Sequence, residues 1–311
     1  MNHDKVNMRR PLNLSESTAQ YRGRFAPSPS GYLHFGSLIA ALASYLHAKN
    51  QQGLWLVRLE DIDPPREMLG ASSAILTTLD AYGLHWDESV LYQSQQSDLY
   101  RDVLQQLAEK KLTYHCQCTR AQIKAQGGIY QGQCRELNLP STNKAIRFRN
   151  HQAVFHYRDL IQGEYSTQQT FAQEDFMLVR KDGLFAYQLA VVLDDIYQNI
   201  SHVIRGCDLL EPTVRQLSFY QQLGYQTPEF GHVPLAVTEP GFKLSKQNKA
   251  LAIDNKNPSP SLILALKFLG QNPPDELYSY SVEQIIRWAT DNWSTEAIPK
   301  KHEITFSSSL F

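Results

Sequence analysis

A turn rich in proline, serine and glycine precedes a histidine in RFAPSPSGYLHFGSLIAALASYL, positions 24 to 46. His34 stands directly before a helical apolar pattern, which places it at the N-terminal end of a predicted helix. Free backbone N–H groups at such an end favour an anion, and small residues let the backbone approach a ligand closely. The stretch indicates a phosphate-binding turn, and an ordinary capped strand-to-helix turn is the alternative.

A second stretch with phosphate-directed chemistry is HVPLAVTEPGFKLSKQ, positions 232 to 247. A predicted strand and a turn at Glu239–Gly241 lead into Lys243 and Lys246, which are three residues apart. Their ammonium groups could neutralise charge that builds on a triphosphate while its α-phosphorus is attacked. Most short basic clusters are solvated loops. Either stretch alone is therefore weak evidence for a phosphate-binding site, and the two together are strong evidence.

Three of the four cysteines lie close together in YHCQCTRAQIKAQGGIYQGQC, positions 114 to 134. Cys116 and Cys118 are two residues apart, and Cys134 returns after a Gly-Gly turn. This spacing is typical of a metal site, and zinc requires a fourth ligand. Unpaired cysteines in a loop are the alternative.

The residue types and their spacing do not identify the fourth zinc ligand. His115 adjoins Cys116, and neighbouring residues rarely point at one ion. Tyr130, four residues before Cys134, could supply a phenolate oxygen, although oxygen is a less usual partner beside thiolates. Cys207 stands apart from the cluster, and we expect a small buried residue there.

The composition excludes several classes of protein. With 311 residues, 42% hydrophobic and 20% charged, the chain has the profile of a globular protein of one large or two modest domains. A net charge of -1 excludes a global basic field, so any nucleic-acid contact must come from a local patch. No stretch is apolar enough to span a membrane, and residues 1–20 are predicted to form a disordered arm rather than a secretory signal. We expect a cytoplasmic enzyme.

The elements that must position these residues alternate between strand and helix. Strands are predicted at 21–26 and 54–59, and helices at 34–49, 68–82 and 98–110. This alternation predicts an α/β fold, a doubly wound parallel sheet of Rossmann type. Ligands bind outside the carboxyl ends of the strands in such sheets, where the His34 turn would lie.

PSPSGYLHFGS and KLSKQ together resemble the HIGH and KMSKS signatures of class I aminoacyl-tRNA synthetases, which join an amino acid to AMP on a Rossmann-type sheet. RLEDIDPPRE, LFAYQLAVVLDD and VIRGCDLLEPTVRQ are similar to the glutamyl branch. The resemblance runs in order from Tyr21 to Gln247. Two positions depart from it, because Ser37 replaces the second histidine of HIGH and Gln247 ends KLSKQ; both still offer hydrogen bonds.

The length after KLSKQ narrows the resemblance. Glutamyl-tRNA synthetases carry a long helical anticodon-binding region there, whereas this chain holds predicted helices at 259–269 and 282–292 and no room for such a domain. GGIYQGQCR and QEDFMLVRKDGLFAYQLAV also match the truncated paralogues, so the chain is identified as a member of the glutamyl-Q tRNA(Asp) synthetases. The resemblance implies ATP-dependent, tRNA-independent activation of glutamate. Glutamate is then transferred to the queuosine base at the wobble position of tRNA(Asp).

A bound glutamate requires an acid for its ammonium group and guanidinium groups for its carboxylates. Glu60 ends LWLVRLE and is predicted to hold the ammonium, with a surface acid as the alternative. Only arginine offers a planar, permanently charged fork, and Arg24 and Arg205 end two strand-like runs. The family places both arginines in the amino-acid pocket.

The resemblance implies a complete set of site residues. Glutamate is bound by Arg24, Ala26, Ser28, Glu60, Tyr187 and Arg205; ATP by Pro27, His34, Gly36, Ser37 and Lys246; zinc by Cys116, Cys118, Tyr130 and Cys134; the catalytic residues are His34, Lys243 and Lys246. Many glutamyl synthetases have Asn where this chain has Val191, which puts one polar contact in doubt. Asp194 and Asp195 are expected on the polar side of their helix, facing ribose or solvent.

The resemblance also implies the organisation of the chain. A disordered arm (1–20) precedes the two halves of the catalytic domain (21–111 and 181–250), a zinc-bearing, acceptor-binding-like insertion (112–180) separates them, and a helical region (251–311) follows. One structural zinc holds the insertion loop rigid. A local basic patch could face RNA, or could be a solvated face; it comprises Arg120, Lys124, Arg135, Arg147 and Arg149, with Tyr130 and Phe148 among them.

The expected partners are glutamate, ATP with magnesium, and tRNA(Asp) carrying queuosine, with no membrane contact, and we expect a monomer. The residues are also compatible with three other functions. The chain could charge the 3′ end of tRNA(Glu), make a nucleotide cofactor as a nucleotidylyltransferase of the same superfamily, or bind RNA as a non-catalytic zinc-bearing module.

Overall fold

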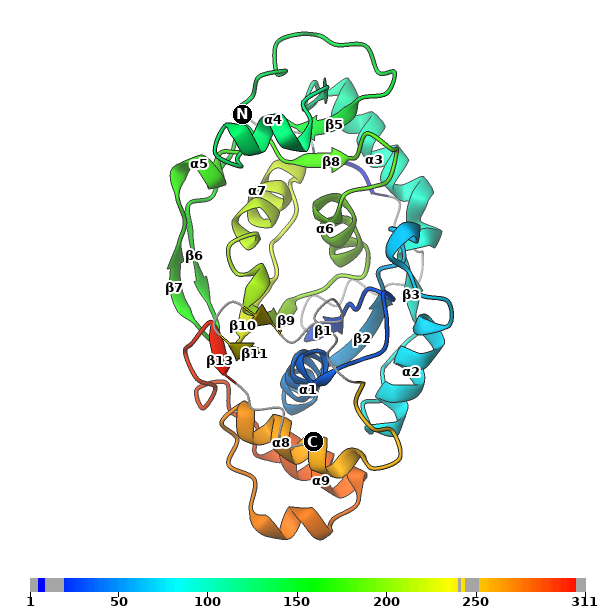
Figure 1. Ribbon diagram of the computed structural model, residues 1–311, viewed down its shortest axis with the longest axis vertical. Helices are drawn as coiled ribbons and strands as arrows, with labels where there is room; N and C mark the ends of the chain where they lie inside the picture. Colours follow the sequence, from blue (N-terminus) through cyan, green and yellow to red (C-terminus); the bar gives the residue numbers. More distant parts are fainter. Residues whose placement is uncertain (1–4, 9–19, 240–241, 244–251, 306–311) are drawn as a thin grey trace.

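The computed structural model describes residues 5–8, 20–239, 242–243 and 252–305 (Figure 1). Lys246 lies outside these residues, and only the backbone of Lys243 is described. Within the described part of the chain, no helix combines the length and the apolar character that crossing a membrane requires.

A parallel sheet lies at the centre of the molecule. It has a three-stranded part, β1 (Arg22–Phe25), β2 (Leu54–Leu59) and β3 (Leu91–Tyr92), and beside it a separately paired two-stranded part, β9 (His202–Gly206) and β10 (Glu229–Val233). β1 pairs with β2, β2 with β3, and β9 with β10, all parallel, and the backbone N–H of Ser201 donates to Arg22 O at 3.0 Å beside β1. The predicted α/β fold with a parallel sheet is therefore confirmed.

Helices cover both faces of this sheet. They are α1 (Phe35–Asn50), α2 (Ala71–Ala81), α3 (Ser97–Glu109), α6 (Tyr187–Tyr197) and α7 (Thr213–Leu223). Because side chains alternate along a strand, Trp55 and Val57 join the apolar cluster around α1, whereas Leu56 joins the cluster around α6 and α7. The predicted helix at 68–82 begins only at Ala71, because Gly70 adopts a left-handed φ of 80° before it.

An insertion between the two halves of the sheet forms one end of the molecule (Figure 1). It contains an antiparallel sheet of β4 (Thr113–Cys116), β5 (Ala145–Phe148) and β8 (Met177–Val179), the hairpin of β6 (His156–Asp159) and β7 (Gly163–Ser166), and the short helices α4 (Arg120–Ala125) and α5 (Gln169–Ala172). The hairpin turns back toward the central sheet, where Leu160 N donates to Phe230 O at 2.8 Å.

The C-terminal segments comprise α8 (Pro258–Phe268), α9 (Val282–Asp291), β11 (Leu235–Glu239), β12 (Phe242–Lys243) and β13 (Glu303–Thr305). Of these, the helices close the opposite end, whereas β11 and β13 lie beside β10 (Figure 1). Side chains of α8 and α9 join the apolar cluster of α1, so this region shares the core of the catalytic half. β13 pairs in parallel with β11, a strand that the sequence did not predict.

Four residues of the N-terminal arm pack against the body of the protein. Val6 and Met8 are buried in the cluster of α3, α6 and α7. Val6 N donates to Leu223 O at 3.2 Å, and the Tyr225 hydroxyl donates to Val6 O at 2.8 Å. Residues 5–8 therefore differ from the disordered arm that the polar composition predicts, because two apolar side chains provide an anchor.

Candidate active site

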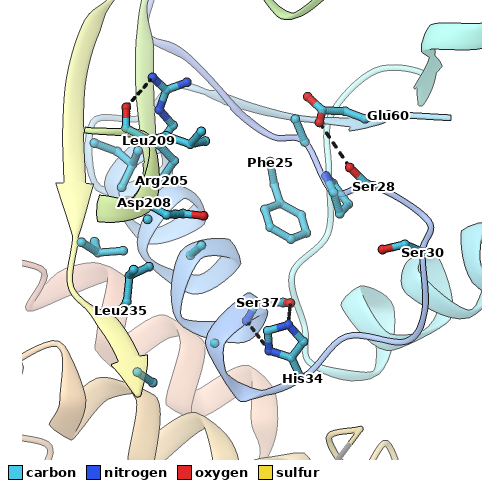
Figure 2. Close-up of a pocket in the computed structure, with 18 of the residues that line it drawn as sticks. Phe25, Ser28, Ser30, His34, Ser37, Glu60, Arg205, Asp208, Leu209 and Leu235 are labelled. Atoms are coloured by element: carbon cyan, nitrogen blue, oxygen red, sulfur yellow. Dashed lines mark hydrogen bonds between the residues drawn. The ribbon is translucent and has the colours of Figure 1, made fainter. Parts of the chain in front are cut away.

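One cavity of about 540 Å³ opens at the carboxyl ends of β1 and β9 (Figure 2). The predicted glutamate and ATP residues that line it are Arg24, Ala26, Pro27, Ser28, His34, Gly36, Ser37, Glu60, Tyr187 and Arg205. Figure 2 shows Phe25 between the Arg205 side and the Glu60 side, with His34 and Ser37 below it. The structure thus brings the two predicted subsites into one space.

His34 caps the helix that starts at the cavity. Its Nδ1 accepts from Ser37 N at 3.3 Å, and its Nε2 lies 3.1 Å from Ser37 Oγ. Since Nδ1 is an acceptor, the neutral ring carries its proton on Nε2 and donates to the serine hydroxyl. Ser37, where the HIGH signature has a second histidine, therefore contacts the first one directly.

The segment that follows the lysine stretch returns to the same turn. Ala252 forms an isolated antiparallel bridge with His34, and Ile253 N donates to Leu33 O at 3.2 Å. On the other side of the stretch, the backbone of Lys243 pairs with Val237 of β11. The chain therefore enters residues 244–251 from β12, which pairs with β11, and leaves them beside His34.

Glu60 lies where β2 ends, next to the turn. Its backbone N–H donates to Pro27 O at 3.0 Å, and the Ser28 hydroxyl donates to its carboxylate at 3.5 Å. Burial raises the pKa of Glu60 to about 7, although the nearby Arg58 and Arg24 cations oppose that rise. A cation entering the cavity would favour the carboxylate form of this side chain.

Arg24 and Arg58 share one buried carboxylate, that of Asp195. Arg24 Nε and Nη2 donate to Asp195 at 3.0 and 3.2 Å, and Arg58 Nη2 donates at 2.5 Å. Although burial opposes ionisation, the two guanidinium groups hold the pKa of Asp195 below its usual range. Asp195 is 3% exposed, so the expectation that it faces ribose or solvent is wrong.

The neighbouring acid, Asp194, has different hydrogen-bonding partners. Asp194 is fully buried, and its Oδ2 accepts from the Tyr100 hydroxyl at 2.7 Å and from Gln93 Nε2 at 2.8 Å. Its expected exposure is therefore also wrong. Val191 is fully buried in the apolar cluster. Its side chain therefore does not provide the polar contact that Asn could make at this position in other glutamyl synthetases.

Arg205 differs from Arg24 because its hydrogen-bonding partners in the described structure are all neutral. Nε donates to His232 Nε2 at 3.0 Å, and Nη1 donates to the Tyr187 hydroxyl at 3.4 Å. Nη2 donates to Thr213 Oγ1 at 2.6 Å and to Gln216 Oε1 at 2.8 Å. Burial lowers the pKa of Arg205, which is the direction expected of a desolvated cation without an adjacent carboxylate.

Sequence reasoning missed the supporting residues Asp195, His232, Thr213 and Gln216. Two signals were present: adjacent acids interrupt the apolar helix at Asp194–Asp195, and a histidine stands inside the strand-like run around 232. A polar residue inside an apolar pattern has the same appearance whether it faces solvent or a buried partner. The pattern alone therefore does not identify these contacts.

The predicted thiol cluster is assembled at the insertion. Ligand atoms of Cys116, Cys118 and Cys134 lie within 4.8 Å of one another, and the Tyr130 hydroxyl accepts from Cys134 N at 2.8 Å. Burial and hydrogen bonding to Cys134 raise the pKa of Cys118 to about 12, so this thiol is protonated unless a bound cation lowers its pKa. Three sulfur donors with a nearby oxygen fit a tetrahedral metal site. Cys207 is buried elsewhere, as predicted.

Much of the predicted basic patch is engaged within the protein. Arg147 is buried, donates to Asp175 O at 2.7 Å and stacks on Tyr130 at 3.7 Å. Arg149 donates to Glu136 at 2.8 Å, and Arg135 lies 3.2 Å from Asp175. Phe148 is a core residue, whereas Arg120 and Lys124 on α4 are exposed. Arg135, Arg147 and Arg149 therefore stabilise the insertion, whereas Arg120 and Lys124 are the exposed part of the predicted patch.

Asp195→Ala is expected to lower the free energy of unfolding by about 3–5 kcal/mol, because it leaves two buried guanidinium groups without their carboxylate. Urea denaturation monitored by circular dichroism measures this change. Asp182→Ala is the matched control, since it removes an exposed partner of Arg180. Equal losses for the two variants would contradict the assignment of Asp195 as a buried ion-pair centre.

Comparison with known proteins agrees with this arrangement. The family described as tRNA synthetases class I (E and Q), catalytic domain, matches residues 20–299. A glutamyl-Q tRNA(Asp) synthetase from Colwellia psychrerythraea is 58% identical over 96% of this chain and 98% of its own length. One from Escherichia coli is 53% identical over 93% of this chain and 94% of its own length.

A solved structure extends the likeness to three dimensions. A glutamate tRNA ligase from Elizabethkingia meningosepticum, crystallised in complex with its amino acid, superposes with a TM-score of 0.76 at 26% identity. The match covers 94% of this chain and 68% of that protein. The fold is that of the class I tRNA synthetases, and by sequence the chain belongs to the glutamyl-Q tRNA(Asp) synthetases within that class.

Proposed function

We propose that the chain uses ATP to convert glutamate to glutamyl-adenylate without tRNA and then transfers glutamate to the queuosine base at the wobble position of tRNA(Asp). The observation that carries this proposal is the single cavity that holds Arg205, a buried cation with neutral partners, and His34 at a helix start. The first suits a side-chain carboxylate, and the second suits a nucleotide phosphate. Membership of the family specifies the acceptor.

In the proposed complex, the glutamate side-chain carboxylate pairs with Arg205 Nη1 and the Tyr187 hydroxyl. The ammonium group pairs with Glu60, whose carboxylate form it stabilises. Arg24 is held by Asp195 and lines the same cavity, so it adds positive potential without losing its own partner. These contacts direct the α-carboxylate toward the His34 side.

ATP would lie over the start of α1, with Pro27, Gly36 and Ser37 near its phosphates and magnesium accompanying them. Lys243 and Lys246 are proposed to neutralise the charge that develops as the α-phosphorus is attacked. The bridge between Ala252 and His34 supports this role, because it joins one end of their segment to the turn. Pyrophosphate leaves, and positioning with charge stabilisation suffices for the step.

In the second step, a hydroxyl of the queuosine cyclopentene ring attacks the carbonyl carbon of the adenylate. A new ester bond forms, the bond to AMP breaks, and the hydroxyl proton is released. This acceptor distinguishes the reaction from charging of the tRNA 3′ end.

The insertion is proposed to carry one structural zinc ion, held by Cys116, Cys118, Cys134 and Tyr130. A closed four-ligand site would stabilise the loop between β4 and β5 without taking part in the chemistry. The four segments predicted after residue 20 remain the proposed organisation of the chain.

Glutamylation of purified tRNA(Asp) with labelled glutamate tests the acceptor. We expect label to enter tRNA that contains queuosine and not tRNA with guanosine at that position. Removal of the 3′-terminal adenosine is the control, and it should leave the labelling intact. Equal labelling of both tRNAs, or loss of label from the trimmed tRNA, would contradict the proposed acceptor.

Atomic emission analysis of the purified protein tests the metal site. About one zinc per chain is expected, as for a closed structural site. Cys118→Ser should lose most of it, whereas Cys207→Ser, a buried thiol outside the cluster, should keep it. The zinc assignment would fail if both variants retained the same zinc content.

A further inference from the structure

Three buried side chains from separate elements are joined by hydrogen bonds, and one of them, Arg205, lines the cavity. Arg205 lies on β9, and His232 is its register partner on β10. Asp159 ends β6, from the insertion, and its Oδ2 lies 2.5 Å from His232 Nδ1. His232 is fully buried, and Asp159 is 2% exposed, so solvent does not share these contacts.

The hydrogen bonds fix where the protons lie. Asp159 Oδ1 accepts the backbone N–H groups of Ile161, Gln162 and His232, which favours an ionised carboxylate. Nδ1 of the imidazole therefore carries a hydrogen and donates it to Oδ2. Nε2 keeps its lone pair and accepts from Arg205 Nε at 3.0 Å. Burial lowers the pKa of His232 to about 4, so the ring is neutral near pH 7.

The remaining nitrogens of Arg205 are held in the same directional way. Thr213 gives its hydroxyl hydrogen to Leu209 O at 2.7 Å, which leaves its oxygen to accept from Nη2 at 2.6 Å. Gln216 accepts the other Nη2 hydrogen at 2.8 Å. Among the described residues, Nη1 has only the long contact to Tyr187, so it is the nitrogen left for a ligand in the cavity.

We propose that Asp159 and His232 are positioning residues that select the amino acid's side-chain carboxylate, by locking the Arg205 guanidinium with Nη1 toward the cavity. The inference rests on the proposed function, because it deepens the role of Arg205 in binding glutamate. A carboxylate directly on Nε would neutralise the cation. A neutral imidazole fixes the orientation and keeps the positive charge available, while the Asp159 charge stands one ring away.

Two substitutions at His232 separate this role from simple packing. In His232→Asn the amide takes the position of Nδ1 and loses the acceptor for Arg205, whereas His232→Gln places an oxygen near Nε2. We expect His232→Asn to raise KM for glutamate by about 10- to 100-fold in glutamate-dependent ATP–pyrophosphate exchange, with KM for ATP unchanged. His232→Gln should recover most of that loss. Equal effects of both variants, or a kcat loss with unchanged KM, would overturn the inference.

The tautomer provides a readout that is independent of activity. In protein labelled with nitrogen-15 histidine, and with the signal assigned by its loss in His232→Gln, nuclear magnetic resonance should show His232 protonated on Nδ1 alone from pH 6 to 8. Asp159→Asn should move the proton to Nε2 and raise KM for glutamate. A parent ring protonated on Nε2 or on both nitrogens would refute the positioning role. Absence of glutamate-dependent exchange in the parent would instead refute the proposed function.

Discussion

A buried guanidinium group without an adjacent carboxylate is the constraint on which the cavity depends. Arg24 and Arg58 are balanced by Asp195, whereas Arg205 contacts only neutral groups in the described structure. A desolvated charge is unfavourable unless a partner compensates for it. The protein therefore carries a buried positive group that, in the proposed function, the side-chain carboxylate of glutamate compensates.

The fold maintains this arrangement through strand alternation. Arg24, Arg58 and Arg205 lie on neighbouring parallel strands and face the side covered by α6 and α7, because residues beside them in the strands face α1. α6 supplies Asp195, and Tyr187 is the first residue of this helix. The start of α1 reaches the same edge from the other face. One sheet edge therefore carries the residues of both the proposed amino-acid subsite and the proposed phosphate subsite.

The sequence was sufficient for the features that leave a local pattern. The apolar runs predicted β2 and α1 closely. The turn before α1 predicted His34 as a site residue, and the ends of two strand-like runs predicted Glu60 and Arg205; the structure places all three on one cavity. The sequence was insufficient where a residue's partner is distant in the chain. Asp195 was expected at the surface because acids usually lie there. Its two arginine partners lie on β1 and β2, far from it in the sequence.

Edge pairing and short anchors were missed for a related reason. β13 is three residues long, and its pairing with β11 depends on the C-terminal helices that bring it there. The docking of residues 5–8 depends on the buried apolar side chains of α3 and α7. Both are properties of the assembled core, and neither short segment has a periodic pattern of its own.

The relative affinity for glutamate and glutamine tests the unbalanced charge most directly. The two ligands have nearly the same shape and differ in side-chain charge. Titration calorimetry of the protein without ATP is predicted to show glutamate binding at least about tenfold more tightly, as expected for a charge-assisted contact to a buried cation. Equal affinities, or tighter binding of glutamine, would contradict a cavity organised around an uncompensated guanidinium group.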